Sequence, residues 1–217
     1  MDGILISSIA SVERSWTRWA ERRGIDPALA RRTAHGRRAI ETVAMLRPDL
    51  DSEAELKVVE QFEIEDNTGL TVLPGVQQLL AALPRGRWTV VTSATDRLAR
   101  IRLAAGGIPV PERLVAAEQV TCGKPHPEPF LAGAELLGIA PADCVVFEDS
   151  ASGARAGRDA GCTVVVTTFS QPAESFAAAH YVVRDLTCVN GETIGDEIML
   201  KLLSIEEPRA DDRILGP

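Results

Sequence analysis

The spacing of apolar residues along the chain changes near Leu73. Before this point Ile9, Val12, Trp16 and Trp19 recur three or four positions apart, the spacing of one buried helix face. We therefore expect helices, and no strand, between about residues 4 and 70. Within this part, the spacing predicts a helix end at 24, helical segments over 28–46 with an interruption near 35–36, and a helix from 52 to 62. The capping-box pattern at 52–55 places Ser52 as the cap of that last helix.

After Leu73, short β-rich apolar runs alternate with helical segments. The runs predict strands at 88–92, 114–116, 144–147, 163–167 and 181–183. The segments between them predict helices at 74–83, 96–105, 129–137 and 152–160. This alternation is typical of a parallel sheet with helices on both faces. Residues 197–203 fit either an added edge strand or a helix.

Composition narrows the classes of function. The chain has 217 residues, 45% of them hydrophobic and 25% charged, with a net charge of −8. A net negative charge repels nucleic-acid phosphates, so we expect no nucleic-acid partner. No apolar run reaches the length that a bilayer needs, and the first residues do not have the form of a signal peptide. We therefore expect a cytoplasmic protein without a membrane partner. The four cysteines are too scattered for a zinc site or a disulfide scaffold.

Polar residues collect where the predicted parallel strands end. Thr92, Ser93 and Ala94 follow one strand, and Glu148 with Asp149 closes another. Because ligands bind at the carboxyl ends of such strands, we expect these residues to form one site, with Lys124 on a loop and Asp2 at the chain start. A hydroxyl, an ammonium and a helix start bind phosphoryl oxygens, and clustered carboxylates bind Mg²⁺. The set predicts metal-assisted phosphoryl transfer.

Each of these motifs also has a plainer interpretation when taken by itself. A Ser or Thr at a strand end is often a helix cap, a Gly-Lys-Pro segment is often a turn with a solvated Lys, and Glu148–Asp149–Ser150 fits loop and cap chemistry. Their order and spacing favour the functional interpretation.

The motifs resemble the haloacid dehalogenase superfamily. The resemblance rests on Asp2–Gly3 near the start, Val-Val-Thr-Ser at 90–93, Gly-Lys-Pro-His-Pro-Glu-Pro at 123–129 and Val-Val-Phe-Glu-Asp-Ser-x-x-Gly at 145–153. Its subfamily is similar to the β-phosphoglucomutases, glycerol-3-phosphatases and 2-deoxyglucose-6-phosphatases. It implies an α/β fold, with a Rossmann-like parallel sheet, helices on both faces and an inserted α-helical cap. The implied division is 1–6 for the start of the core, 7–72 for the cap, 73–190 for the core and 191–217 for an extension.

The resemblance also implies catalytic roles. Asp2 is the acid that protonates the leaving alkoxide and then activates water, and Ser93, or Thr92 in the alternative alignment, holds the transferring phosphoryl group with the backbone of Ala94. Lys124 stabilises its charge.

The resemblance further implies a Mg²⁺ site and substrate contacts. Glu148 and Asp149 complete the metal site with the backbone carbonyl of Asp2. In the cap, His35 and Arg38 are expected to face the substrate.

The sequence departs from the family pattern at its start. In the family the nucleophile is an aspartate two residues before Asp2, on an apolar strand in the centre of the sheet, and the sequence begins at Met1. We expect a start codon assigned at an internal Met. Without that strand, the sheet is expected to contain a gap with unpaired backbone groups.

The sequence supports one leading hypothesis and two alternatives. The leading one is a Mg²⁺-dependent phosphatase that hydrolyses a small phosphorylated metabolite, such as a glycerol, polyol or sugar phosphate, through an aspartyl-phosphate. We expect it to be a monomer. The alternatives are a sugar phosphomutase of the same subfamily and an inactive phosphate-binding or regulatory protein that lacks the nucleophile.

Overall fold

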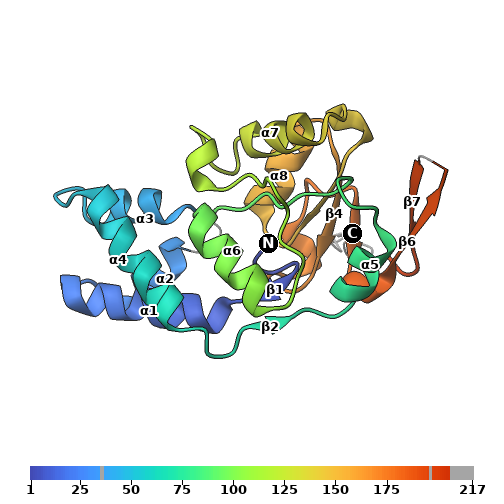
Figure 1. Ribbon diagram of the computed structural model, residues 1–217. Coiled ribbons are helices and arrows are strands. Elements are labelled where there is room, and N and C mark those ends of the chain that lie inside the picture. The colour runs from blue at the N-terminus through green and yellow to red at the C-terminus, as the bar shows by residue number, and fades with distance from the viewer. Residues whose placement is uncertain (35–36, 196, 206–217) are drawn as a thin grey trace, which may run out of the picture.

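The computed structural model describes residues 1–34, 37–195 and 197–205 (Figure 1). The α-helices are α1 (Ile9–Arg23), α2 (Pro27–Ala34), α3 (Ala39–Leu46), α4 (Ser52–Glu65), α5 (Val76–Ala82), α6 (Asp96–Ala105), α7 (Glu128–Leu137) and α8 (Ala151–Asp159). Short 3₁₀ turns span Ala117–Gln119, Pro141–Asp143, Ala173–Ser175 and Leu186–Cys188. The strands are β1 (Ile6–Ser7), β2 (Thr71–Val72), β3 (Val145–Glu148), β4 (Thr163–Thr167), β5 (Tyr181–Val183), β6 (Val189–Ile194) and β7 (Glu197–Leu202).

The central sheet is parallel, with the strand order β3–β4–β5. Its middle strand is the run Thr-Val-Val-Val-Thr, and its side chains alternate between the two faces. Val164 and Val166 pack against residues of α7 and α8, whereas Val165 packs against residues of α5 and α6. A continuous apolar run on a strand is explained by burial on both faces. The α/β fold with helices on both sides of a parallel sheet is confirmed.

The predicted strands at 88–92 and 114–116 are wrong as regular strands. Val91 and Val115 form one isolated parallel bridge, flanked by hydrogen bonds from Thr92 N to Val115 O (2.8 Å) and from Val115 N to Val90 O (2.9 Å). On the other side, an apolar cavity of about 500 Å³ is lined both by residues 88–91 and by 145–147 of β3. The pairing with residue 115 is limited to one bridge and the cavity separates 88–91 from β3, so the run lacks the consecutive ladder pairs of a regular strand.

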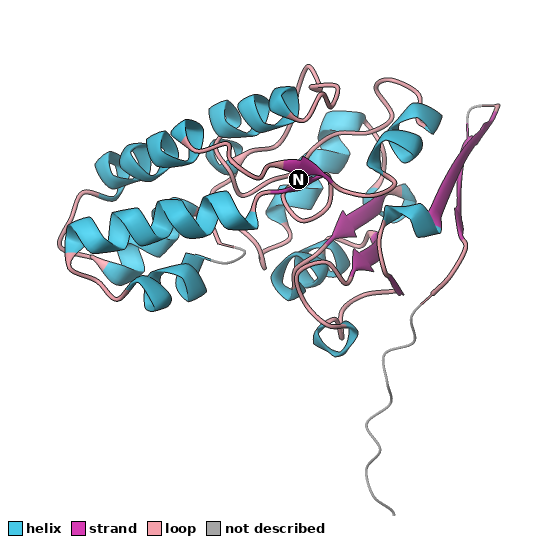
Figure 2. Cartoon of the chain, turned by 90° about the horizontal axis from the view of Figure 1, so that it is seen from below, coloured by secondary structure: helices cyan, strands magenta, loops and turns pink. Residues whose placement is uncertain are grey.

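Helices α1 to α4 form a lobe with its own hydrophobic core (Figures 1 and 2). Trp16 and Trp19 pack edge to face in this core, 5.3 Å apart between ring centroids, and the Trp19 indole donates to Glu55 at 2.7 Å. The predicted helix cap is wrong: Asp51, not Ser52, accepts hydrogen bonds from the first backbone N–H groups of α4. Asp51 takes this position because its backbone is extended, as a capping residue requires.

Two chain crossings join this lobe to the rest of the molecule. They run side by side as β1 and β2, an antiparallel pair in which Ile6 is opposite Val72 and Ser7 is opposite Thr71. The expectation of no strand between residues 4 and 70 therefore misses β1. The cap bounds expected at 7 and 72 stay a prediction.

Residues 189–202 form a β-hairpin apart from the central sheet. Strands β6 and β7 pair only with each other among the described residues, and β6 contacts α5. In Figure 2 the hairpin lies at the end of the molecule opposite the α1–α4 lobe. Of the two possibilities left open for 197–203, the strand is correct, but it does not extend the central sheet.

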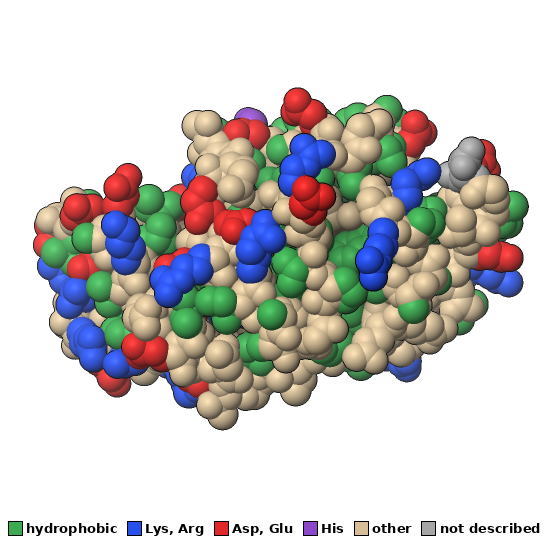
Figure 3. Space-filling view, viewed as in Figure 1, with side chains coloured by type: hydrophobic (Ala, Val, Ile, Leu, Met, Phe, Trp, Pro, Cys, Tyr) green, Lys and Arg blue, Asp and Glu red, His purple; other side chains and the backbone are tan. Residues whose placement is uncertain are grey.

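The surface bears charges of both signs. Figure 3 shows basic and acidic side chains intermixed over the α1–α4 lobe, without an extended area of positive charge on that face. Among the described residues, no helix is long and apolar enough to cross a membrane.

We predict that Gly75→Ala destabilises the fold strongly. Gly75 precedes α5 with φ +83°, and an added Cβ would lie 2.2 Å from the backbone carbon of Leu186 and 2.3 Å from Thr187 N. Backbone atoms cannot yield as a flexible side chain can, so overpacking of about 1–3 kcal/mol adds to the conformational cost. The control is Gly138→Ala, at φ +67° with no atom within 4 Å of the new Cβ, which should cost only about 1–2 kcal/mol. Urea unfolding measures both; equal losses would contradict the packing assigned to Gly75.

Candidate active site

A cavity of about 200 Å³ lies between the α1–α4 lobe and the carboxyl end of the sheet. Most of the residues that the sequence assigned to one site line this cavity, namely Asp2, Thr92, Ser93, Ala94, Lys124, Asp149 and Arg38. Glu148 lies directly behind it, in contact with Lys124. His35, the remaining predicted residue, lies outside the described residues.

Lys124 and Glu148 form a buried ion pair. Their side chains are 10% and 5% exposed, and Lys124 Nζ donates to Glu148 Oε1. The other carboxylate oxygen of Glu148 accepts from Asp149 N at 2.9 Å, Ser150 N at 3.0 Å and Ser150 Oγ at 2.9 Å. Burial opposes the ionisation of Glu148, but the Lys124 ammonium outweighs it and holds the pKa of Glu148 well below its usual range. Glu148 therefore fixes the position of Lys124.

The turn after β3 requires small and capping residues. Ser150 is the N-cap of α8, and its hydroxyl accepts from Gly153 N at 3.1 Å. A Cβ at Gly153 would lie 2.0 Å from the carboxylate carbon of Glu148, so only glycine allows this close approach. The Glu-Asp-Ser-x-x-Gly motif thus places the Glu148 carboxylate against the start of α8.

The pKa of Asp149 is shifted in the opposite direction to that of its neighbour Glu148. No Lys or Arg in the described part of the chain forms an ion pair with it. Burial, followed by the nearby Glu148 carboxylate, raises the pKa of Asp149 to about 6. The side chain packs against Gly3, where φ is +74° and a Cβ would lie 1.9 Å from Asp149 Oδ2. The half-buried Asp149 carboxyl lines the same cavity as Asp2, and in its ionised form it is a ligand that a hard divalent cation would bind. The donor set fits Mg²⁺.

The Thr92–Ser93–Ala94 segment turns between the strand end and α6. Thr92 is buried, and its hydroxyl accepts from Ala94 N at 3.2 Å. Thr95 caps α6 by accepting from Leu98 N at 3.2 Å. In the described structure the Ser93 hydroxyl has no hydrogen-bond partner, although it lines the cavity. Of the two alternative alignments, this arrangement favours Ser93 as the hydroxyl that contacts a ligand.

Arg38 fastens the cap lobe to the loop that leads to Lys124. Its guanidinium donates to Val120 O at 3.0 Å and Thr121 O at 3.0 Å, and it pairs with Glu41. Its donors are thus directed to the protein itself. Arg38 also lines the cavity, and its expected contact with the substrate stays a prediction.

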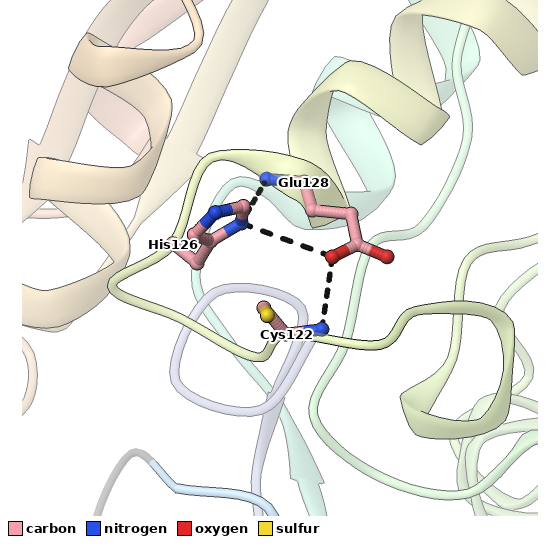
Figure 4. A group of neighbouring side chains, drawn as sticks. All are labelled: Cys122, His126 and Glu128. Carbon is pink, nitrogen blue, oxygen red and sulfur yellow. Dashed lines mark hydrogen bonds and ion pairs between the residues drawn. The ribbon is translucent and has the colours of Figure 1, made fainter.

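The same loop contains a Cys122–His126–Glu128 cluster (Figure 4). The Glu128 carboxylate accepts from Thr121 N at 2.6 Å and Cys122 N at 2.9 Å, and these bonds lower its pKa. His126 Nδ1 lies 3.8 Å from Glu128 Oε2. These hydrogen bonds join the Glu128 side chain to the loop backbone and thereby stabilise the conformation of the loop around Lys124.

Two residues of the site, Arg102 and Glu63, were not predicted from the sequence. Arg102 on α6 is 2% exposed and lies between Asp2 and Glu63, both of which line the cavity. Burial raises the pKa of Glu63 to about 7, although the Arg102 charge lowers it. A signal was present: Arg102 shares a helical face with the buried Leu98 and Leu103. A charged residue on a buried face needs an internal partner.

Comparison with known proteins agrees with this arrangement. A model of the haloacid dehalogenase-like hydrolases matches residues 1–161. Hexitol phosphatase A of Escherichia coli is 40% identical over 170 residues, covering 76% of this chain and 79% of that protein. Glycerol-1-phosphate phosphohydrolase 2 of Saccharomyces cerevisiae is 31% identical over 183 residues, covering 78% and 73%. The structure of CbbY from Rhodobacter sphaeroides in complex with phosphate is 21% identical with a TM-score of 0.76, covering 86% of this chain and 92% of CbbY, and supports the fold. The chain belongs to the haloacid dehalogenase-like hydrolases, as its motifs predict.

Proposed function

We propose that this hydrolase is a Mg²⁺-dependent phosphatase of small phosphate monoesters. The observation that carries the proposal is the cavity itself, in which an ammonium, an unpartnered hydroxyl and two carboxyl groups converge from Lys124, Ser93, Asp2 and Asp149. Such a set binds a phosphoryl group and supplies a proton donor beside it. The names of the relatives, a hexitol phosphatase and a glycerol-1-phosphate phosphohydrolase, support a polyol or sugar phosphate as the substrate.

In the proposed reaction, Ser93 and Lys124 hold the phosphoryl oxygens. A carboxylate attacks phosphorus, and the P–O bond to the substrate alcohol breaks as Asp2 gives its proton to the leaving oxygen. Asp2 then takes a proton from water, the water oxygen attacks phosphorus, and phosphate leaves as the carboxylate is regenerated. In the family that the motifs resemble, the attacking carboxylate belongs to an aspartate two residues before the position of Asp2.

The residues that would hold Mg²⁺ are Asp149, Glu148 and the backbone carbonyl of Asp2. When bound, the cation supplies positive charge against the phosphoryl oxygens. Asp149 is the main side-chain ligand in this proposal, because Glu148 already binds Lys124 and two backbone N–H groups.

The size of the cavity favours a compact substrate. Its volume of about 200 Å³ is below the usual range for drug-sized ligands, which begins at about 300 Å³. The cap lobe contributes Trp16 to the lining, but that ring is buried in the lobe's own core. A glycerol or hexitol chain fits such a space better than a nucleoside.

We predict a preference for polyol and sugar phosphates over nucleotides. Phosphate release is measured with glycerol phosphate, hexitol phosphates, hexose phosphates and AMP, each with Mg²⁺ and with EDTA. The assay uses residues 1–217 and a chain that carries the family's apolar strand and aspartate before Met1. The longer chain should release phosphate only with Mg²⁺, with kcat/KM for its best polyol or sugar phosphate at least about tenfold above AMP. A higher kcat/KM for AMP, or equal rates in EDTA, would contradict the proposal.

We predict that Asp149→Asn raises stability without metal and removes the response to Mg²⁺. In the folded protein Asp149 has a pKa of about 6, above its ordinary value of 3.8, so the folded state binds this proton more tightly. Its contribution therefore favours folding at low pH and is lost as pH rises from about 4 to about 6. In EDTA at pH 7.5 the variant should melt above the wild type, with a smaller difference at pH 5. Mg²⁺ should raise the Tm of the wild type only.

The matched control for this experiment is Asp143→Asn, the same change at an exposed position away from the cavity. It should melt like the wild type in EDTA and keep the full Mg²⁺ response. If Asp149→Asn also keeps that response, Asp149 is not a metal ligand.

A further inference from the structure

Arg102 is a buried charge with two carboxylate partners. Its Nη1 donates to Asp2 Oδ1 at 3.1 Å, and its Nη2 donates to Glu63 Oε2 at 3.2 Å. The side chain is 2% exposed, and its Nε has no hydrogen-bond partner in the described structure. Burying a guanidinium in this way is costly, and a hydrophobic side chain of similar size often stabilises a core as well or better. Stability alone therefore does not account for an arginine here.

The three residues come from three separate parts of the chain. Asp2 lies at the start of the core, Arg102 lies on core helix α6, and Glu63 lies on cap helix α4. Helices α4 and α6 pack against each other, and in Figure 1 α6 lies between α4 and the sheet. Arg102 is thus a bridge from the cap to the Asp2 carboxylate, and all three residues line the cavity.

The chemistry of arginine suits such a bridge. Its planar guanidinium presents donors in a fixed fork, so two carboxylates bound to it are held in a fixed relative orientation. Lysine would supply the charge but not the fork. The contact to Asp2 uses one of its two carboxylate oxygens, and the other stays available to a substrate.

We propose that Arg102 is a positioning residue that orients the Asp2 carboxylate, and that Glu63 of the cap holds Arg102 in that position. The inference rests on the proposed role of Asp2 as acid and base. Proton transfer by Asp2 then depends on the position of the cap lobe on the core. A cap displaced from α6 releases Glu63 from Arg102, and Asp2 then loses its fixed orientation.

Kinetics of Arg102→Lys and Glu63→Gln test the proposal. They are measured in the longer chain of the substrate assay, with the best substrate of that assay. Because a misplacement of about 1 Å can reduce a rate about 100-fold, Arg102→Lys should lower kcat by about that factor with KM changed less than about twofold. Glu63→Gln, which keeps an acceptor for Arg102, should lower kcat by less, about tenfold. Thermal melting shows whether each variant folds, and Glu63→Gln keeps the test valid if Arg102→Lys does not.

The matched control is Arg97→Gln. Arg97 also connects α6 to α4, through an ion pair with Glu60 at 3.4 Å, but it is 62% exposed and does not touch Asp2. Its loss should leave kcat within about twofold of the wild type, because surface ion pairs contribute little. An equal loss of kcat in Arg97→Gln and Arg102→Lys would show that α4–α6 docking in general, and not the bridge to Asp2, controls the rate, and would overturn the proposal.

A double-substitution cycle separates this inference from the proposed function. Asp2→Asn should itself lower kcat by about 100-fold or more, and adding Arg102→Lys should cause no further loss. A further loss of the same size as in the wild-type background, or a raised KM with unchanged kcat, would overturn the positioning role alone. If Asp2→Asn leaves kcat unchanged, the role of Asp2 is wrong and the inference fails with it.

Discussion

The buried Lys124–Glu148 ion pair is the interaction on which the arrangement of the site depends. It joins two segments that are far apart in sequence, the loop before α7 and the last residue of β3. A lone buried ammonium would lose its charge or force the loop open, so Lys124 needs an ionised partner to remain a cation beside the cavity. Glu148 can serve because its second oxygen accepts N–H and O–H groups from the next two residues. The loop that contains Lys124 is also held by Glu128 and Arg38.

Two adjacent carboxyl groups acquire different properties from their surroundings. Glu148 is paired and ionised, whereas burial and the charge of Glu148 raise the pKa of Asp149 to about 6. The difference follows from position: Glu148 ends β3 and points toward Lys124, and Asp149 follows it and packs against Gly3. A protein that only needed stability would not keep a carboxyl in that environment. Carboxyl groups with a raised pKa are common at sites where a bound ligand or metal interacts with the ionised form.

Local sequence patterns predicted much of the fold. The boundaries of α6, β4 and β5 follow from apolar runs, and the C-terminal end of α1 follows from Gly24, which takes the left-handed conformation. The absence of a regular strand at 88–92 was not predictable in this way, because it depends on the segments with which the run can pair and not on the run itself. The cap at Ser52 failed because two capping residues stand next to each other, and only the backbone conformation decides between them.

For the site, the sequence predicted which residues lie together at the strand ends, but it did not predict the contacts between elements. Seven of the predicted residues line one cavity, six of them from the core, where parallel strands end at the same edge of the sheet. Arg38 binds the core loop, and Arg102 joins Asp2 to Glu63, through contacts between residues separated by 39 to 100 positions. Such pairings depend on how the cap lobe packs on the core, which no local pattern records.

The central claim is that Lys124, Ser93 and Asp149 form one phosphoryl and metal site. A crystal structure of the protein grown with Mg²⁺ and orthovanadate tests it most directly, because vanadate occupies phosphoryl sites. The account predicts vanadate oxygens in contact with Lys124 Nζ and the Ser93 hydroxyl, and the cation bound by the Asp149 carboxylate. Vanadate bound outside the cavity between cap and core, or a cation without contact to Asp149, would contradict it.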